Sequence, residues 1–419
     1  MIRHMINNIS FSDLGLDELL IQAVNEVGYQ NPTPIQAKAI PMALTGRDLM
    51  ASSQTGTGKT ASFILPVLHR LAQMRARKSI RALVLVPTRE LAIQVYNSFQ
   101  TYGTHTIIKI VAVYGGVDIE TQLQVLNEGV DVLVATPGRL VDMINRKHVH
   151  LHSLRILVLD EADHMLDLGF RDDIERILQN APIKRQNLLF SATFSKEIKQ
   201  LAHEFMRHPV TIELENPNSA ARTVTQFFYP VDQQDKPEIL SYIIHGGRWK
   251  KVLVFVRTKK VANKVARLLE EDGITAQAIH SDKSQNLRIR TLEDFKDNHF
   301  DVLVATDVAA RGLDIQQLPL VINYDLPKVP QDYVHRIGRT GRAGQKGRAI
   351  SLVNPEEKKW LASIQQVIKK TLKITHLPYF EDGEVRPAEI DEPGSSRNKR
   401  TKFNMKTENP AIKHHLGSL

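Results

Sequence analysis

The hexapeptide DVLVAT stands at Asp131–Thr136 and again, unchanged, at Asp301–Thr306, an offset of 170 residues. A second pair of segments keeps this offset: VLVPTRELA begins at Val84 and VFVRTKKVA begins at Val254. Chance or a shared preference for strand residues can produce one such match, but two matches in register indicate two copies of one domain. Because there are only two units, we expect paired domains rather than a solenoid.

Each copy alternates short runs of valine, isoleucine and leucine with longer segments of helical periodicity. This alternation is typical of an α/β fold in which a parallel sheet is covered by helices on both faces. The expected strands are Ala82–Val86, Asp131–Ala135, Arg155–Leu159, Asn187–Phe190, Lys251–Val256, Asp301–Ala305 and Pro319–Asn323. Ligands bind at the carboxyl ends of strands in open α/β sheets. The polar residues that follow these runs therefore mark the expected site: Thr88, Thr136, Asp160, Ser191, Thr258 and Thr306.

The chain length also favours two domains, because 419 residues exceed the size at which one core keeps growing. We place the first domain at 1–213, a linker at 214–223 in the segment LENPNSAART, and the second domain at 224–378. From 379 to 419 the periodicity is lost and the sequence runs into GSSRNKRTKFNMK. This composition predicts a flexible basic tail rather than a third domain.

The composition is that of a soluble globular protein, with 42% hydrophobic and 24% charged residues. The apolar runs are of strand length, no signal peptide is evident, and we expect a cytoplasmic protein without membrane contact. The absence of cysteine excludes disulfides and thiolate metal sites. A net charge of +9 and a pI of about 9.5 suggest a polyanionic partner, although a merely soluble basic protein would explain the charge equally well.

The segment from Asp48 reads as a strand, a glycine-containing loop and a helix. Its loop matches the phosphate-loop pattern, except that Ser53 replaces the first glycine. In such a loop backbone amides turn towards the phosphates, the lysine reaches the β- and γ-phosphates, and the following hydroxyl can hold Mg²⁺. The residues expected to bind the nucleotide in this way are Ser53, Gln54, Thr55, Gly56, Thr57, Gly58, Lys59 and Thr60.

Two further motifs carry charge. In ILVLDEAD, Asp160 ends an apolar strand and Glu161 follows, a pair that suits one carboxylate for Mg²⁺ and one to take a proton from water. An acidic helix start explains the pair as well.

In HRIGRTGR, Arg336, Arg339 and Arg342 recur at every third position. Such arginines form either a structural ion-pair cluster or part of an anion site.

The segment HVHLH places His148, His150 and His152 at alternate positions, where they would share one side of a strand as metal ligands do. No cysteine or neighbouring acidic ligand completes such a site, so we expect a hydrogen-bonded or solvated loop instead.

Taken together, these motifs resemble the DEAD-box ATP-dependent RNA helicases of helicase superfamily 2, a family named for the sequence at Asp160–Asp163. Similar to that family are, in order, Phe11, GYQNPTPIQ, SSQTGTGKT, PTRELA, Gly115-Gly116, TPGR, SAT, VFVRT, QNLR, ATDVAARGLD and HRIGRTGR. The resemblance runs from about Phe11 to Pro378 and implies two tandem RecA-like domains. The segment NYDLPKVPQDYVHRIGRTGRAG looks most like the bacterial RhlE branch.

The resemblance implies a role for each matched residue at the nucleotide. Gln36 would pair with adenine, which predicts ATP as cofactor, Phe11 would stack on the base, and Asp314 would contact the ribose. A core contact for the following helix is the alternative for Phe11. Thr60 and Asp160 would hold Mg²⁺. The catalytic residues would be Lys59, Asp160 and Glu161 of the first domain and Arg339 and Arg342 of the second.

The resemblance also implies an RNA site and a polar network that couples it to the nucleotide. The network would consist of Asp163, Ser191, Thr193 and His335. The RNA contacts would map to Thr88, Arg89, Gly116, Thr136, Arg139, Thr258, Arg288 and Thr306. These small or basic residues suit a sugar-phosphate backbone, and none is aromatic, so we expect weak sequence specificity. Helix capping is the alternative for each threonine.

The function implied is RNA-stimulated ATP hydrolysis, coupled to closure of two domains on single-stranded RNA and to local unwinding of short duplexes. An ATP-gated RNA clamp with incidental turnover and a DNA helicase of the same superfamily remain open as alternatives. Ribosome-assembly or RNA-decay proteins are conceivable partners.

Overall fold

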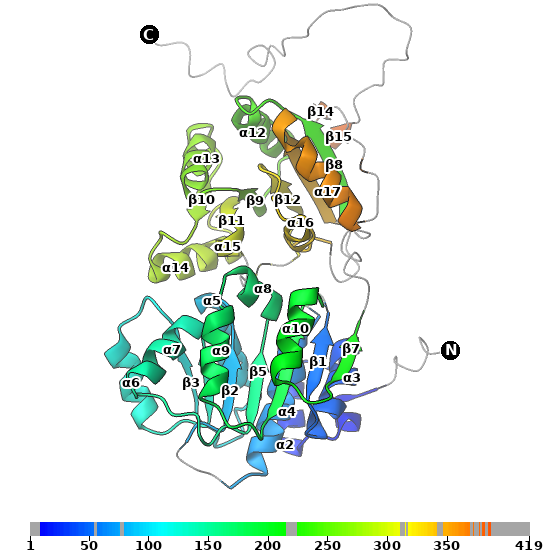
Figure 1. Ribbon diagram of the computed structural model, residues 1–419. Helices are drawn as coiled ribbons and strands as arrows, with labels where there is room; N and C mark the ends of the chain where they lie inside the picture. The colour runs from blue at the N-terminus through cyan, green and yellow to red at the C-terminus, as the bar shows by residue number, and fades with distance from the viewer. Residues whose placement is uncertain are drawn as a thin grey trace, which may run out of the picture.

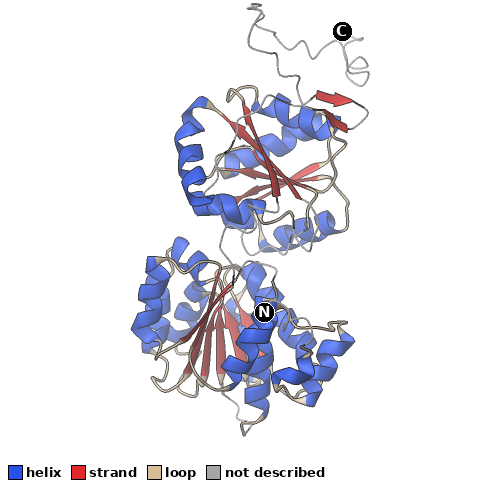
Figure 2. Cartoon of the chain, turned by 90° about the vertical axis from the view of Figure 1, so that its right-hand side faces the viewer, coloured by secondary structure: helices blue, strands red, loops and turns tan. Residues whose placement is uncertain are grey.

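The computed structural model describes residues 9–53, 57–75, 79–214, 224–310, 315, 317–341, 347–368, 372, 377, 379–381 and 384–386. Figure 1 shows two α/β domains, one above the other, with the N-terminal half of the chain below. Each contains one parallel sheet with helices on both faces, as Figure 2 shows from the side. The predicted fold class is therefore confirmed.

The first domain is built on a sheet of seven parallel strands in the order β3-β4-β2-β5-β6-β1-β7. Its strands are β1 (Leu49–Ser52), β2 (Ala82–Leu85), β3 (Ile110–Val113), β4 (Val132–Ala135), β5 (Ile156–Leu159), β6 (Gln186–Ser191) and β7 (Val210–Glu213). Its helices are η2 (Phe11–Leu14), α2 (Glu18–Glu26), α3 (Pro34–Leu44), α4 (Lys59–Ala72), α5 (Arg89–Tyr102), α6 (Ile119–Asn127), α7 (Pro137–Asn145), α8 (Ala162–Asp167), α9 (Arg171–Gln179) and α10 (Lys196–Phe205).

The second domain has a sheet of six parallel strands in the order β10-β11-β9-β12-β13-β8. Its strands are β8 (Val224–Pro230), β9 (Val252–Val256), β10 (Ala276–Ile279), β11 (Val302–Thr306), β12 (Leu320–Asn323) and β13 (Gly347–Val353). Its helices are α12 (Lys236–Gly246), α13 (Lys259–Glu271), α14 (Gln285–Lys296), α15 (Asp307–Ala310), α16 (Pro330–Ile337), η3 (Pro355–Glu357) and α17 (Lys358–Ile368).

The internal repeat is visible in the pairing of the strands. In the first sheet Val84 of β2 pairs with Val134 of β4, and in the second Val254 of β9 pairs with Val304 of β11. Both pairs are thus related by the offset found in the sequence. Because the two copies keep the same register, residues at the same offset occupy equivalent places at the strand ends.

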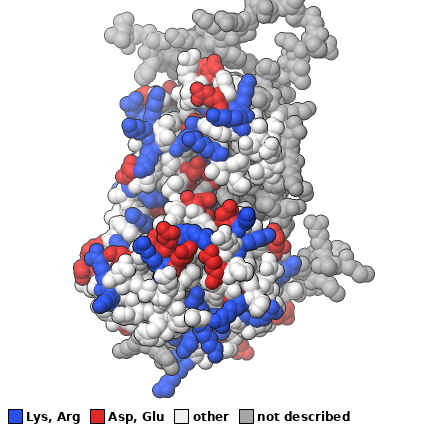
Figure 3. Space-filling model, in the orientation of Figure 1, with Lys and Arg blue, Asp and Glu red and all other residues white. Residues whose placement is uncertain are grey.

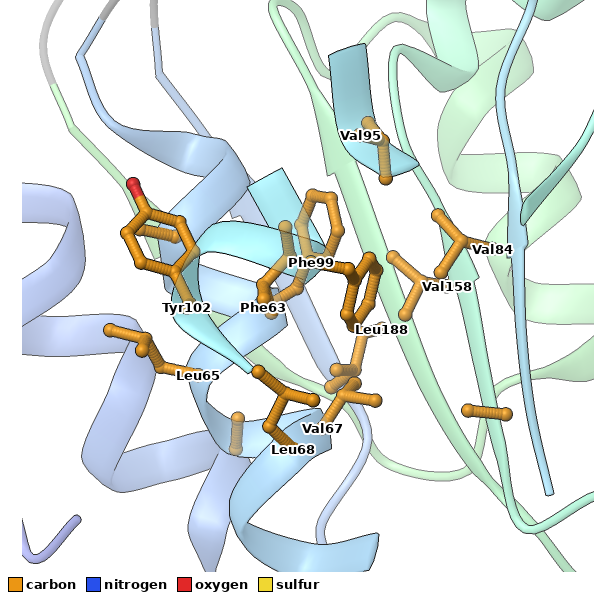
Figure 4. Close-up of a cluster of buried hydrophobic side chains, with 14 of the residues drawn as sticks. Phe63, Leu65, Val67, Leu68, Val84, Val95, Phe99, Tyr102, Val158 and Leu188 are labelled. Atoms are coloured by element: carbon orange, nitrogen blue, oxygen red, sulfur yellow. The ribbon is translucent and has the colours of Figure 1, made fainter. Parts of the chain in front are cut away.

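The core of the first domain lies on both faces of its sheet. On one face Phe63 of α4 packs against Phe190 of β6, with ring centroids 5.3 Å apart. Figure 4 shows this cluster, in which aromatic side chains of α4 and α5 meet Val84, Val158 and Leu188. The central strands are buried along their whole length, which is why they appear in the sequence as continuous apolar runs.

The domain boundaries remain predictions, but the elements around them are clear. β7 ends the first sheet at Glu213 and β8 begins the second at Val224. Two short strands, β14 (Tyr379–Glu381) and β15 (Glu384–Arg386), pair antiparallel inside the segment predicted to be a structureless tail. The rest of that tail lies outside the described residues. Within the described part of the chain, no helix is both long and apolar enough to cross a membrane.

Candidate nucleotide and RNA site between the domains

The phosphate loop joins β1 to α4 as expected. Gly58 caps α4 with φ 92°, a left-handed conformation that glycine adopts without strain. Lys59 begins the helix, and its buried Nζ donates a hydrogen bond of 2.8 Å to the Ser53 carbonyl oxygen. The hydroxyls of Ser53 and Thr57 lie 2.7 Å apart, and Thr60 is half-buried in the first turn of α4. Gln54, Thr55 and Gly56 lie outside the described residues.

Gln36 connects this loop to α3. Its Oε1 accepts a hydrogen bond of 2.8 Å from the Thr33 amide, and its Nε2 donates one of 3.2 Å to the Gly58 carbonyl. A Cβ on Gly58 would lie 2.4 Å from Nε2, so only glycine fits beside this amide. Phe11 is 3% exposed and belongs to the core of the first domain. The structure thus shows the core contact that was the alternative for Phe11, and base stacking stays a prediction.

The two adjacent carboxylates after β5 have opposite electrostatic environments. Burial raises the pKa of Asp160 to about 7, although the charge of Lys59 opposes the shift. Glu161 has a left-handed backbone with φ 51° and ψ 49°. Burial raises its pKa too, but a hydrogen bond from His164 and the charges of Lys59 and Arg339 outweigh burial and lower the pKa of Glu161 to about 2. Glu161 is therefore ionised at neutral pH.

Three of the four predicted coupling residues meet in one network. Oδ2 of Asp163 accepts hydrogen bonds of 3.1 Å from the amides of Ala192 and Thr193. The Thr193 hydroxyl lies 3.3 Å from the same oxygen, and the Ser191 hydroxyl donates to the Thr193 carbonyl at 2.7 Å. The fourth residue, His335, lies half-buried on α16 of the second domain.

The arginines of HRIGRTGR have different roles in the structure. Arg336 is buried, and its guanidinium pairs in a bidentate way with Asp307, at 2.6 and 2.7 Å. It is therefore the structural ion pair that the sequence left open. Arg339 is also buried, and its charge reaches Glu161 of the first domain strongly enough to lower the pKa of that carboxyl. Arg342 and Asp314 lie outside the described residues.

The predicted RNA residues lie at the ends of equivalent strands and the helices that follow. Thr136 directly follows β4 and Thr306 is the last residue of β11, and both are buried. Thr88 and Thr258 cap α5 and α13, each accepting a hydrogen bond of 3.3 Å from a backbone amide. The capping alternative is thus realised for these two threonines. It leaves the hydroxyl proton of each free to donate to a phosphate.

Two predicted RNA-binding arginines are held by the first domain itself. The guanidinium of Arg89 lies so close over the glycine pair that a Cβ on Gly116 would be 1.9 Å from its Nη1. Gly116 also has φ 79°, so both space and backbone conformation require glycine there. Arg139 donates a hydrogen bond of 2.9 Å from Nη2 to the Val117 carbonyl. Both arginines therefore converge on the loop after β3.

The third predicted RNA-binding arginine, Arg288 of α14, crosses to the first domain. Its Nη2 lies 2.9 Å from Oε1 of Glu90, on the first turn of α5, and Nε2 of Gln285 donates to the same oxygen at 2.9 Å. Glu90 is only 4% exposed and Gln285 is 6% exposed, so the contact is buried between the domains. The sequence does not predict this role of Glu90 and Gln285, because nothing in it places α14 against α5.

Comparison with known proteins identifies the family. The model of the DEAD/DEAH box helicase family matches residues 33–201, and that of the helicase conserved C-terminal domain matches residues 235–344. Over 381 residues the chain is 43% identical to the ATP-dependent RNA helicase CshA of Listeria monocytogenes, a match that covers 90% of this chain and 73% of that protein. The chain belongs to the DEAD-box ATP-dependent RNA helicases.

A second relative supports the same family without fixing the branch. The DEAD-box ATP-dependent RNA helicase RhpA of Helicobacter pylori is 43% identical over 376 residues, covering 90% of this chain and 76% of that protein. The motif near HRIGRTGR suggested the RhlE branch. The two relatives carry the names CshA and RhpA, so they support the DEAD-box family but not that branch specifically.

Solved structures agree with the arrangement of the domains. Dbp5 of S. cerevisiae bound to RNA and ADP BeF3 is similar with a TM-score of 0.78 at 34% identity, covering 88% of this chain and 95% of that one. A DEAD box protein from Methanococcus jannaschii is 38% identical but gives a TM-score of only 0.51, covering 88% and 99%. The better superposition thus comes with the lower identity.

The oxygen donors of the DEAD-box site fit Mg²⁺, which prefers carboxylate and hydroxyl oxygens, with Asp160 and Thr60 as candidates. The three histidines of HVHLH lie on the surface of the first domain. The side chains of His148, His150 and His152 are exposed, while Val149 and Leu151 between them are buried in the core. Among the residues that the structure describes, no group of three potential ligands could hold a metal ion. The expectation of a solvated loop fits this geometry.

Proposed function

We propose that this DEAD-box helicase hydrolyses ATP in the cleft between its domains and couples closure of that cleft to binding of single-stranded RNA. The observation that carries the proposal is that the charge of Arg339, from the second domain, acts on Glu161 of the first, at a junction where Arg288 and Glu90 are also in buried contact. An arginine at the γ-phosphate stabilises the charge of the transition state and contributes about 10³- to 10⁵-fold in rate. Closure of the domains is therefore required for catalysis, and Arg342 is proposed to act beside Arg339.

The first domain would hold the nucleotide. Lys59 and the loop amides bind its phosphates, while Gln36 selects adenine and Asp314 contacts the ribose from the second domain. Thr60 and Asp160 would hold Mg²⁺, which neutralises charge on the β- and γ-phosphate oxygens. The ionised carboxylate of Glu161 accepts a hydrogen bond from the attacking water and orients it.

RNA would bind across both domains through the backbone. Arg89, Gly116 and Arg139 surround one loop of the first domain. In the second domain Thr258 caps α13, just after β9, and Thr306 ends β11. Figure 3 shows acidic and basic side chains intermixed on one face of the molecule, including the junction of the domains. Net charge alone therefore does not locate the RNA on that face, and the proposal depends on the matched residues and their strand-end positions.

Because ATP and RNA each contact both domains, each favours the closed arrangement and each increases the affinity of the other. In the family the closed state bends one RNA strand, which cannot remain in a duplex, so closure separates short duplexes locally. Hydrolysis then serves to reopen the cleft and recycle the enzyme.

The test is a comparison of steady-state ATP hydrolysis with and without single-stranded RNA, for the wild type and Glu161→Gln. We expect RNA to stimulate the wild type and the substitution to remove hydrolysis while nucleotide binding persists. Equal, negligible rates in all four samples would leave an ATP-gated clamp as the function. Stimulation by DNA but not by RNA would contradict the choice of nucleic acid.

Finer assignments belong to the proposal as well. Placement in the RhlE branch rests on the motif near HRIGRTGR, and a cytoplasmic location rests on composition. Ribosome-assembly or RNA-decay proteins as partners are supported only by the family. Sequencing RNA crosslinked to the protein in cells would test the substrate directly.

A further inference from the structure

The residue that follows the DEAD sequence is a histidine in contact with the proposed water-orienting carboxylate. His164 lies on α8, three residues after Glu161, and its Nδ1 is 3.3 Å from Oε2 of Glu161. The His164 side chain is 6% exposed and that of Glu161 is 16% exposed. Both side chains of this pair are therefore largely shielded from water. They lie within one turn of Asp160, the other carboxylate of the proposed site.

The surroundings of the ring fix where its proton lies. A carboxylate oxygen only accepts, so Nδ1 must carry the hydrogen that it donates to Glu161. Nε2 of His164 is buried without a hydrogen-bond partner in the part of the chain that the structure describes. The hydrogen bond that the ring makes in this part of the chain is therefore the one from Nδ1–H to Glu161.

The backbone at Glu161 does not itself fix the carboxylate. It precedes α8 in a left-handed backbone conformation, and its side chain makes no capping hydrogen bond to the helix. A glutamate side chain has several rotatable bonds, and holding it in one rotamer costs conformational entropy. The imidazole fixes one carboxylate oxygen, which leaves the other free to face an attacking water. A fixed carboxylate matters because displacement of a reacting group by 1 Å can cost about 100-fold in rate.

We propose that His164 is a positioning residue for hydrolysis: its Nδ1–H holds Glu161 in the orientation that directs water at the γ-phosphate. The inference rests on the proposed function, in which Glu161 orients that water. It predicts a defect in the hydrolysis step alone, since His164 is not among the residues that would hold ATP or RNA.

The experiment compares three substitutions of His164. Asparagine places an amide N–H two bonds from Cβ, where the histidine has Nδ1, and so keeps the donor. Leucine keeps much of the volume without a donor, and glutamine carries its amide one bond further out. The measurements are the single-turnover rate of ATP hydrolysis at saturating RNA, the dissociation constants for ATP and RNA, and the thermal unfolding midpoint.

We expect His164→Leu and His164→Gln to slow the hydrolysis step by about 10- to 100-fold, with both dissociation constants within about twofold of the wild type. His164→Asn should hydrolyse ATP within about threefold of the wild type. Wild-type rates in the leucine and glutamine variants would overturn the inference. So would an asparagine variant that is folded but as slow as the leucine variant, because packing alone would then explain the loss.

Two controls separate this inference from the function on which it rests. Glu161→Gln must abolish hydrolysis, and if it does not, the role of Glu161 itself is wrong. If Glu161→Gln is inactive while His164→Leu is as fast as the wild type, only the role of His164 fails. Should the leucine variant not fold, the polar pair of asparagine and glutamine decides the question, since both keep an amide in the pocket.

Discussion

Loss of the Glu90 charge should hinder closure of the two domains. In this structure Oε1 of Glu90 accepts from both Arg288 and Gln285, and the Arg288 side chain is only 10% exposed; we take this contact to belong to the proposed closed arrangement. Glu90→Gln keeps the shape of the side chain but leaves the guanidinium without its counter-charge. In an open arrangement water solvates Arg288 in either protein. The penalty therefore falls on the closed state.

The size of the effect follows from the burial of this pair. Removing one partner of a buried ion pair costs about 3–5 kcal/mol. Arg288 keeps some exposure and lies among residues proposed to contact RNA phosphates, so the lower limit applies. A cost of about 3 kcal/mol lowers the closing constant by about 100-fold, at 1.4 kcal/mol per factor of ten. The double variant Glu90→Gln with Arg288→Gln should recover part of this loss, because no buried charge remains unpaired.

The chain contains no cysteine, so closure can be followed with dyes on two introduced cysteines. Ile183 is 77% exposed in the first domain, and the side chain of Arg267 is 71% exposed in the second. Energy transfer between Ile183→Cys and Arg267→Cys is measured against RNA concentration with ADP and beryllium fluoride. The Glu90→Gln midpoint should rise by about 100-fold.

The matched control is Arg290→Gln on the same helix, α14. Arg290 pairs with Asp294 inside the second domain, and its side chain is 81% exposed, so its loss should leave closure unchanged within about twofold. A Glu90→Gln midpoint equal to that of the wild type would refute the argument that this contact stabilises the closed state. A double-mutant cycle without coupling between Glu90 and Arg288 would refute the pairing itself.

Three further outcomes are expected. Asp160→Asn should raise the free energy of unfolding of the nucleotide-free protein at pH 8, by at most about 4 kcal/mol, while weakening binding of Mg²⁺-ATP. The sign follows from burial, which raises the folded-state pKa of Asp160 to about 7. The contribution of this group to stability therefore falls as pH rises from about 4 to 7, and the variant lacks this fall. Gly116→Ala should displace Arg89 and lower RNA affinity, measured by fluorescence anisotropy, with ATP affinity in the absence of RNA unchanged. Arg339→Ala should reduce RNA-stimulated hydrolysis at least about 10³-fold while ATP binding, measured by titration, changes little.

The fold was largely predictable because its central strands are buried on both faces. The strands β2, β4 and β9 consist only of apolar residues. At the same offset of 170 residues, β2 recurs as β9 and β4 recurs as β11. Five described strands of the two parallel sheets are missing from the expected list: the edge strands β3, β7, β8 and β10 and the internal strand β13. An edge strand does not need a continuous apolar run, although β3 has one. In β10, AQAI has too few bulky residues to stand out from a loop.

The site was predictable only in part, for a reason that is also physical. Polar residues at strand ends, such as Asp160 and Thr306, indicate a site because a parallel sheet collects its strand ends at one edge. Contacts between the domains carry no such signal. Glu90 and Gln285 are 195 residues apart in sequence, and their meeting depends on the orientation of two whole domains. For Arg336, the pattern of arginines left two roles open until Asp307 was found beside it.

The contact between Glu90 and Arg288 also explains how RNA could drive closure. Glu90 follows Arg89 directly on the first turn of α5, and Arg89 lies over Gly116 in the proposed RNA site. Arg288 is itself a proposed RNA contact. A phosphate backbone that attracts both arginines therefore brings together the same two helices that Glu90 joins, so RNA binding and closure share side chains. If closure also brings Arg339 to Glu161, as proposed, the turn proposed to receive RNA and the turn proposed to cleave ATP would respond to a single movement.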